Sequence, residues 1–205
     1  MIYQFKDAIP YVHPSAFVHP QATVTGAVEI GADVYIGPGA AIRGDWGRIV
    51  IEEGCNVQEN CTIHMFPGVT VLLEAGAHIG HGAIIHGAHI GRDVLIGMNA
   101  VVMDDVEIGE GCIVGALTFI KAGEIYAPRS LVVGNPARKI GDVNDDMLLW
   151  KKEGTAWYQR LSSDMHQHWK EVEPLRQPPT QPYQPTDVTL YKPWKKSQQT
   201  KSENL

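Results

Sequence analysis

Three histidines, His64, His81 and His86, are the residues of this 205-residue chain whose type and spacing could do chemistry. Neutral imidazole binds zinc, and three such ligands with an open fourth position are typical of catalytic rather than structural zinc sites. A metal held in this way lowers the pKa of bound water to about 7 and so supplies hydroxide at neutral pH. Iron or cobalt could use the same ligands, because ligand type alone does not select the metal. We therefore predict a metal site formed by these three residues.

A spacing of six residues indicates which elements must position these histidines. Aliphatic residues recur at this interval in four runs, which are Val12, Val18, Val24, Ile30, Ile36 and Ile42; Ile51, Val57 and Ile63; Leu73, Ile79 and Ile85; and Ile90 to Val132. Such a period is typical of a parallel β-helix built from hexapeptides, in which three units form one triangular coil of about eighteen residues. The sequence therefore predicts an all-β solenoid with the aliphatic residues inside.

Two further positions of the repeat have an expected role. Small residues two places before the aliphatic residue also point inward, and they include Cys55, Cys61 and Cys112, which we expect to be buried and unreactive. Glycine often follows the aliphatic residue, as at Gly31 and Gly97, and we expect it there because corners need backbone angles that glycine adopts cheaply.

The repeat predicts where the histidines lie relative to one another. Its spacing is interrupted between residues 42 and 51, 63 and 73, and 85 and 90. His64 and His86 each follow an aliphatic residue and lie one coil apart on one face, about 4.8 Å from each other. His81 falls at the corner leading to a different face, so we expect it to join the metal from a neighbouring chain around a threefold axis. His78 and His89, one place before an aliphatic residue, are expected to be solvated.

The rest of the chain differs from the repeat. Residues 1–141 are predicted to form the β-helix, 142–173 a helix packed along it and capped by Asp142 or Asn144, and 174–205 an extended Pro-rich tail. The formal charge of −6 does not support nucleic-acid binding, and no run is apolar enough to span a membrane. The first ten residues lack the features of a signal peptide, so we expect a cytoplasmic protein.

Three stretches carry a resemblance to a known family. They are Arg43-Gly44-Asp45, the run from Asn56 to His64, and the run from Ile79 to Gly87. Together they resemble the γ-class carbonic anhydrases, whose fold is a left-handed β-helix. The helical segment with Trp150, Tyr158 and Leu161 narrows the resemblance to the subgroup of the phenylacetic acid degradation protein PaaY and the carnitine-operon protein CaiE.

This resemblance implies an assembly and roles for further residues. It implies a homotrimer with zinc or iron between the subunits, and an ion pair of Arg43 and Asp45 across the interface. It places Gln58 where the family positions the metal-bound water or the substrate, and Glu59 as an interface acid. Tyr158 matches a tyrosine that some members bring near the metal.

The loop after His64 indicates the class of substrate. Residues 65–68 contain no carboxylate, whereas the archetypal family member carries a glutamate there that shuttles protons. We therefore expect a metal-dependent hydrolase of acyl-CoA thioesters, linked through the resemblance to aromatic acid breakdown. Three alternatives remain, which are CO2 hydration at the same metal, CoA-dependent acyl transfer without a metal, and a non-catalytic accessory role.

Overall fold

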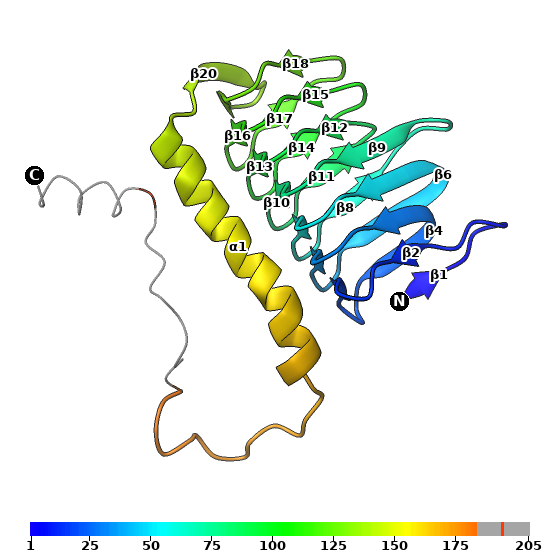
Figure 1. Ribbon diagram of the computed structural model, residues 1–205, viewed down its shortest axis with the longest axis vertical. Helices are drawn as coiled ribbons and strands as arrows, with labels where there is room; N and C mark the ends of the chain where they lie inside the picture. The colour runs from blue at the N-terminus through cyan, green and yellow to red at the C-terminus, as the bar shows by residue number, and fades with distance from the viewer. Residues whose placement is uncertain (184–193, 195–205) are drawn as a thin grey trace, which may run out of the picture.

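The computed structural model describes residues 1–183 and Trp194, and these form a parallel β-helix with one long helix beside it (Figure 1). Seven parallel strands and a final antiparallel one form an eight-stranded sheet, in the order β20 (Arg138–Asp142), β19 (Ser130–Val133), β16 (Ile113–Val114), β13 (Leu95–Ile96), β10 (His78–Ile79), β7 (Asn56–Val57), β5 (Tyr35–Ile36) and β3 (Phe17–Val18). The predicted fold class, a left-handed parallel β-helix with a C-terminal helix along it, is confirmed.

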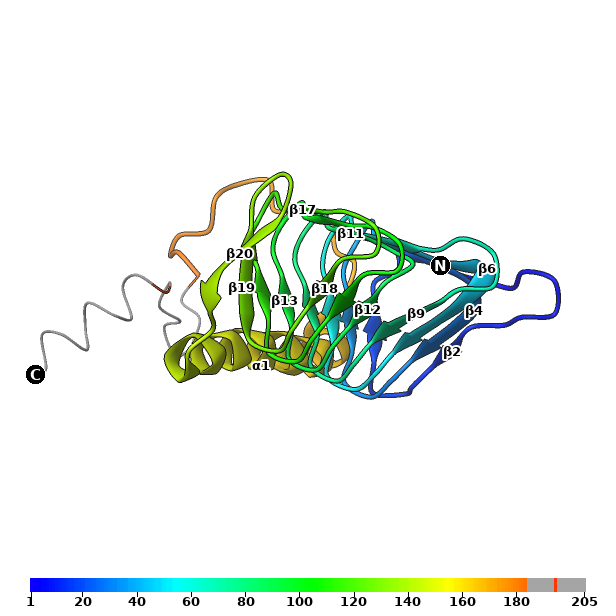
Figure 2. The same ribbon diagram turned by 90° about the horizontal axis from the view of Figure 1, so that it is seen from above.

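The other two faces of the solenoid share one twelve-stranded sheet. Its strands are β1 (Ile2–Tyr3), β2 (Tyr11–Val12), β4 (Thr23–Ile30), β6 (Ala41–Ile51), β8 (Thr62–His64), β9 (Thr70–Leu73), β11 (Ile84–His86), β12 (His89–Ile90), β14 (Val101–Val102), β15 (Glu107–Ile108), β17 (Phe119–Ile120) and β18 (Ile125–Tyr126). The faces join because β6 is long enough to pair with β8 at one end and with β9 at the other. The first interruption of the repeat is therefore a continuous strand, and Figure 2 shows this corner extending from the solenoid.

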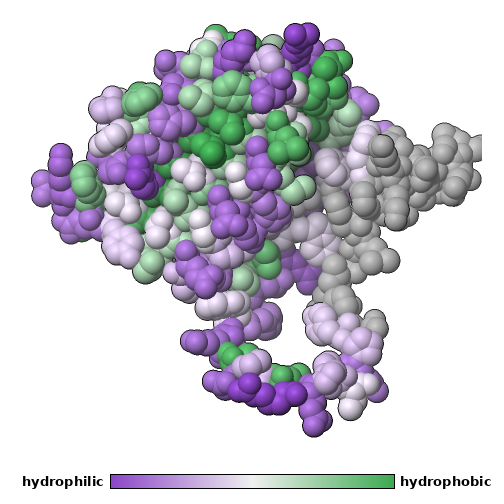
Figure 3. All heavy atoms as spheres, turned by 180° about the vertical axis from the view of Figure 1, so that it is seen from behind, coloured by the Kyte–Doolittle hydropathy of each residue, from purple (hydrophilic) through white to green (hydrophobic). Residues whose placement is uncertain are grey.

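The inward residues of the repeat form one continuous core. The aliphatic positions from Val24 to Ile120 and the small residues before them are almost wholly buried. All three cysteines lie in this core, and burial raises the pKa of the Cys55 thiol to about 12 and that of Cys61 to about 11. Such thiols are poor nucleophiles at neutral pH. Hydrophobic side chains also reach the surface, and Figure 3 shows them gathered on part of one face.

The expected role of the glycines after the aliphatic residues is wrong. Gly31 and Gly97 have no positive φ, and the left-handed backbone falls two residues later in the repeat, where the residues are Asp33, Gly39, Gly54, Asn60, Gly76, Gly82, Asp93, Asn99, Asp105, Gly111, Leu117, Gly123 and Arg129. A Cβ on Gly97 would lie 2.4 Å from the backbone nitrogen of Ala116 in the next coil. Glycine is needed after the aliphatic residue because adjacent coils approach closely there.

Helix α1 (Asp145–His168) lies within the predicted range of 142–173 and crosses the eight-stranded sheet (Figures 1 and 2). Asn144, one of the two predicted caps, accepts a hydrogen bond from the backbone of Met147. Residues 174–183 contain no helix or strand, and the rest of the predicted tail, apart from Trp194, lies outside the described residues. Among the residues that the structure describes, no helix is long and apolar enough to cross a membrane.

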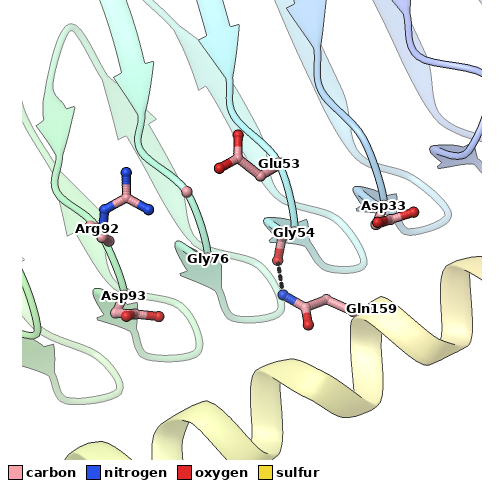
Figure 4. A pocket seen from close by; sticks show the side chains of 8 residues that line it. Asp33, Glu53, Gly54, Gly76, Arg92, Asp93 and Gln159 are labelled. Atoms are coloured by element: carbon pink, nitrogen blue, oxygen red, sulfur yellow. Dashed lines mark hydrogen bonds between the residues drawn. The ribbon is translucent and has the colours of Figure 1, made fainter.

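Polar side chains attach α1 to the coils. The fully buried residues of the helix are Lys151, Thr155 and Ser162, whereas its large apolar residues are at least partly exposed. Nζ of Lys151 donates to the carbonyl of Gly76 at 2.6 Å, and Oγ of Ser162 donates to backbone carbonyls of the first coils. Nε2 of Gln159 donates to the carbonyl of Gly54 at 3.1 Å (Figure 4). These bonds fix the position of the helix along the coils.

Candidate functional site

Two of the candidate ligands lie side by side on the twelve-stranded sheet. His64 ends β8 and His86 ends β11, and these strands pair in parallel with the two histidines in register. Their ring centroids are 5.4 Å apart. Both side chains leave the strands on the outer side of the solenoid, because their neighbours Ile63 and Ile85 fill the core.

A carboxylate fixes the ring of His86. Its Nδ1 lies 2.7 Å from Oδ1 of Asp104, which leaves Nε2 directed away from that partner. In metal sites the ring nitrogen that does not bind the ion usually contacts a carboxylate or carbonyl, which sets the tautomer and the ring orientation. Sequence reasoning missed Asp104, although it lies eighteen residues after His86, one coil further on.

His64 has a different environment. Its Nε2 lies 2.9 Å from Oδ1 of Asp45 and 3.0 Å from Nη2 of Arg43. Nε of Arg43 and Oδ2 of Asp45 are 3.8 Å apart, so the two residues expected to pair across an interface contact each other within one chain. A metal on Nε2 of His64 would require both the guanidinium of Arg43 and the carboxylate of Asp45 to move from their present contact with this nitrogen.

Two exposed aromatic side chains flank the histidine pair. Trp46 is 52% exposed and its ring lies 5.2 Å from that of His64, while Phe66 is 56% exposed and lies 5.0 Å from the ring of His86. Phe66 belongs to the loop between β8 and β9, in which Met65 is fully buried. The surroundings of the pair are therefore apolar on two sides.

His81 belongs to a second group of residues, at the corner after β10. Its Nδ1 is in contact with a carboxylate oxygen of Glu59, and its backbone N–H donates to Oε1 of Gln58 at 3.2 Å. The other carboxylate oxygen of Glu59 accepts a hydrogen bond from the hydroxyl of Tyr35. Within the described part of the chain, Nε2 of His81 makes no hydrogen bond, so it is the nitrogen available to a ligand.

Gln58 joins this corner to a histidine beneath α1. Its amide nitrogen donates to Oδ1 of Asn56 at 2.9 Å and to Nε2 of His78 at 2.6 Å, which uses both amide hydrogens. Nδ1 of His78 lies 3.3 Å from the hydroxyl of Thr155 on α1. Burial, with a smaller effect of nearby positive charge, lowers the pKa of His78 to about 3. The expectation that His78 is solvated is wrong, because α1 covers it and it is a neutral hydrogen-bonded residue.

Tyr158 lies with the second group. Its ring is 5.3 Å from that of His78 and 5.6 Å from that of Tyr35. Burial and the nearby charge of Glu59 raise the pKa of its phenol to about 12, so the hydroxyl is neutral at physiological pH. One chain thus presents two separate groups, with His64 and His86 in one and His81, Gln58, Glu59 and Tyr158 in the other.

The histidines suit a divalent ion such as zinc, but they could surround one ion only if two chains each contribute ligands. No three histidine, cysteine, aspartate or glutamate side chains within residues 1–183 or at Trp194 are grouped so as to hold a metal. His86 and His81 each contact a carboxylate through Nδ1 and keep Nε2 available, as histidine ligands of zinc do. The participation of His81 from a second chain stays a prediction.

Comparison with known proteins agrees with the class that the coils define, a hexapeptide-repeat protein. The family model described as bacterial transferase hexapeptide (six repeats) matches residues 87–122. The carnitine operon protein CaiE of Escherichia coli K12 is 49% identical over 175 residues, which cover 85% of this chain and 89% of CaiE. The chain therefore belongs to the γ-carbonic anhydrase-like hexapeptide-repeat family, in the group of CaiE.

Two solved structures share the fold over most of the chain. One is described as a putative acetyltransferase of Bacillus cereus, with a TM-score of 0.78 and 34% identity, covering 79% of this chain and 94% of that one. The other is a hexapeptide transferase family protein of Anaplasma phagocytophilum, with a TM-score of 0.77 and 28% identity, covering 80% of this chain and 96% of that one.

Proposed function

We propose that this chain is a metal-dependent hydrolase of acyl-CoA thioesters that acts as a homotrimer. In this proposal His64 and His86 of one chain and His81 of its neighbour hold zinc, iron or cobalt. The observation that carries the proposal is the contact of Asp104 with Nδ1 of His86 and of Glu59 with Nδ1 of His81. Both contacts present the opposite ring nitrogen to a ligand, which a merely structural histidine does not require.

The proposed reaction is the addition of water to a thioester carbonyl. The water oxygen bonds to the carbonyl carbon, the carbon–sulfur bond breaks, and the products are a carboxylic acid and the thiol of CoA, which takes a proton from the water. A bound metal of this type polarises a carbonyl and lowers the pKa of water. Asp104 and Glu59 keep the two histidine rings in one tautomer and orientation.

In this proposal Gln58 positions His81, and Arg43 lies beside His64. Both amide hydrogens of Gln58 are already donated, so Gln58 is a positioning residue that fixes the backbone at His81 rather than a donor to the reacting oxygen. The guanidinium of Arg43 is half exposed and lies beside His64, with Asp45 as the carboxylate within reach when it turns. Tyr158 supplies a neutral phenol on the side of His81.

The apolar surroundings favour an organic substrate over CO2. Trp46 and Phe66 flank the histidine pair, and residues 65–69 contain no carboxylate. Rapid CO2 hydration needs a group that carries protons away, whereas thioester hydrolysis places an organic group against such side chains. CO2 hydration remains the alternative that uses the same ligands.

CoA-dependent acyl transfer is the second candidate. The descriptions of the two similar solved structures, an acetyltransferase and a transferase family protein, favour it. It predicts transfer of the acyl group to an acceptor without a requirement for a metal. A non-catalytic accessory role predicts neither reaction.

One set of assays separates these candidates. The full chain is loaded with zinc and tested for thiol release from phenylacetyl-CoA, octanoyl-CoA and acetyl-CoA, for CO2 hydration, and for acyl transfer, before and after chelation. His81→Ala should abolish thiol release, whereas His89→Ala, an exposed histidine paired with Glu74 on another face, should not. Thiol release that survives chelation or loss of His81 would refute the metal mechanism. Rapid CO2 hydration with no thiol release would refute the choice of substrate.

A further inference from the structure

A cavity of about 570 Å³ lies between α1 and the outer surface of β10, β13 and β16. Glycines line it on both sides, with Gly80, Gly97 and Gly115 on the coils and Gly154 on the helix. The three glycines of the coils follow Ile79, Ile96 and Val114, which are in register on neighbouring strands, so they lie one above another. The backbone at these stacked glycines forms one wall of the cavity, and the helix that passes over them forms the other.

The lining of the cavity changes from one end to the other. Its apolar walls come mainly from the coils of β13 and β16 and from the helix, and they are Leu95, Met98, Ile113, Trp150 and Trp157. Its polar lining at the β10 end is Gln58, His78, His81 and Tyr158. The ammonium of Lys151 also borders the cavity, but it donates to the carbonyl of Gly76 and pairs with Asp93. The cavity therefore suits an uncharged, mostly apolar group with a polar atom at the end next to His81.

We propose that this cavity binds the acyl group of the substrate, and that the group is uncharged, apolar and larger than acetyl. The inference rests on the proposed function, because it places the thioester carbonyl beside His81 and the carbon chain between α1 and the coils. An acetyl group is too small to reach the walls formed by Met98 and Trp157. Ligand cavities of this volume bury most of a small molecule, and their affinity comes from the apolar surface they cover.

The proposal can be tested by a substitution on α1 that fills the cavity with a side chain. Gly154→Leu places a side chain in the cavity at a helical position where leucine is favoured over glycine. Ala156→Leu, on an exposed position of the same helix, is the matched control. Binding of N-acetylcysteamine thioesters of acetate, hexanoate, octanoate and phenylacetate is measured on metal-free protein by intrinsic tryptophan fluorescence. Hydrolysis of the matching CoA thioesters is measured on the zinc-loaded protein.

We expect the affinity of the wild-type protein to rise about threefold to fourfold for each added methylene up to octanoyl. Gly154→Leu should weaken octanoyl binding at least tenfold and leave acetyl binding unchanged, and Ala156→Leu should behave as wild type. Met98→Ala, which removes one wall without filling space, should weaken octanoyl binding severalfold and gives an answer if Gly154→Leu does not fold.

The outcomes separate this inference from the proposed function. Affinity that does not depend on chain length, or that changes equally in Gly154→Leu and Ala156→Leu, overturns the cavity assignment even if thioesters are hydrolysed. Chain-length-dependent binding that Gly154→Leu abolishes supports the cavity even if no thioester is hydrolysed, and the hydrolase proposal alone then fails.

Discussion

Mixing two inactive variants tests whether the proposed site joins two chains. His81→Ala removes the ligand expected from one chain, and His86→Ala removes a ligand expected from its neighbour. Each variant alone should form trimers that bind no metal at the site and release no thiol. Mixed trimers should recover both properties, because one interface can combine His86 of the first variant with His81 of the second.

The structure sets the size of this recovery. His64 and His86 are paired in register on β8 and β11, so both must come from the same chain, and only His81 is free to come from another. In trimers assembled at random from equal amounts, a site is complete when its first chain is His81→Ala and its neighbour is His86→Ala. The probability is one half times one half, so zinc content and thiol release should reach about a quarter of the wild-type values.

The matched control mixes His64→Ala with His86→Ala. Both changes then affect the same half of the site, and no arrangement of chains restores it. Co-expression with two affinity tags gives the mixed trimers, and zinc is counted by mass spectrometry of the purified protein. Equal recovery in both mixtures, or no recovery in the first while wild type binds zinc, would refute a site shared between chains.

Three other predictions test the contacts around the site and in the coils. Asp104→Asn should weaken zinc binding about 10- to 100-fold because it removes the carboxylate from His86, whereas Asp105→Asn at the next position should not. Competition with a coloured chelator measures the zinc affinity of both variants. Equal zinc affinities of the two variants would contradict the role of Asp104. Gly97→Ala should lower the free energy of unfolding by about 1–3 kcal/mol because the next coil leaves no room for a Cβ, whereas Gly141→Ala, with open space around it, should be near neutral in urea unfolding. The pKa of His78 is lowered to about 3 from 6.5, so the unfolded chain binds an extra proton between these values and stability falls as the pH falls from 6.5 towards 3. His78→Gln should reduce this pH dependence by an amount on the order of a few kcal/mol, and unchanged dependence between pH 7 and pH 4 would show that burial of this ring is not its cause.

The repeat predicted the fold because one interval fixes both the face and the coil of each residue. The same count brings His64 and His86 together. Extended by one coil it reaches Met103 rather than Asp104, so the contact of Asp104 with His86 lies one residue outside the register. The role predicted for the glycine after the aliphatic residue is wrong because a preference for certain backbone angles concerns only one chain segment. The constraint at Gly97 comes from the backbone of the next coil, which a local dihedral argument does not contain.

Residues under the helix were harder to predict from the sequence. His78 has the position of an outward, solvated residue in the repeat, and only the path of α1 over its coil buries it. The sequence predicted a helix packed along the coils, but it did not indicate that the buried residues of this helix are Lys151, Thr155 and Ser162. Their role depends on backbone carbonyls at corners far away in the chain, which no helical period shows.

Because its fully buried contacts are polar, α1 can separate from the coils in a local opening of the structure. A helix held by a continuous buried apolar stripe cannot leave its sheet without exposing that stripe to water. The fully buried side chains of α1 are instead polar ones, such as Lys151 and Ser162, which donate to corner carbonyls. Among its aromatic contacts with the coils are those of Tyr158 with Tyr35 and His78. Water can satisfy the polar groups when they separate, so α1 can open as one unit while the coils stay folded. The free energy of opening is then lower for α1 than for the coils. Amide hydrogen exchange should therefore be much faster in α1 than in the strands. Tyr158 belongs to α1, so opening of the helix would also remove Tyr158 from its place beside His78 and Tyr35.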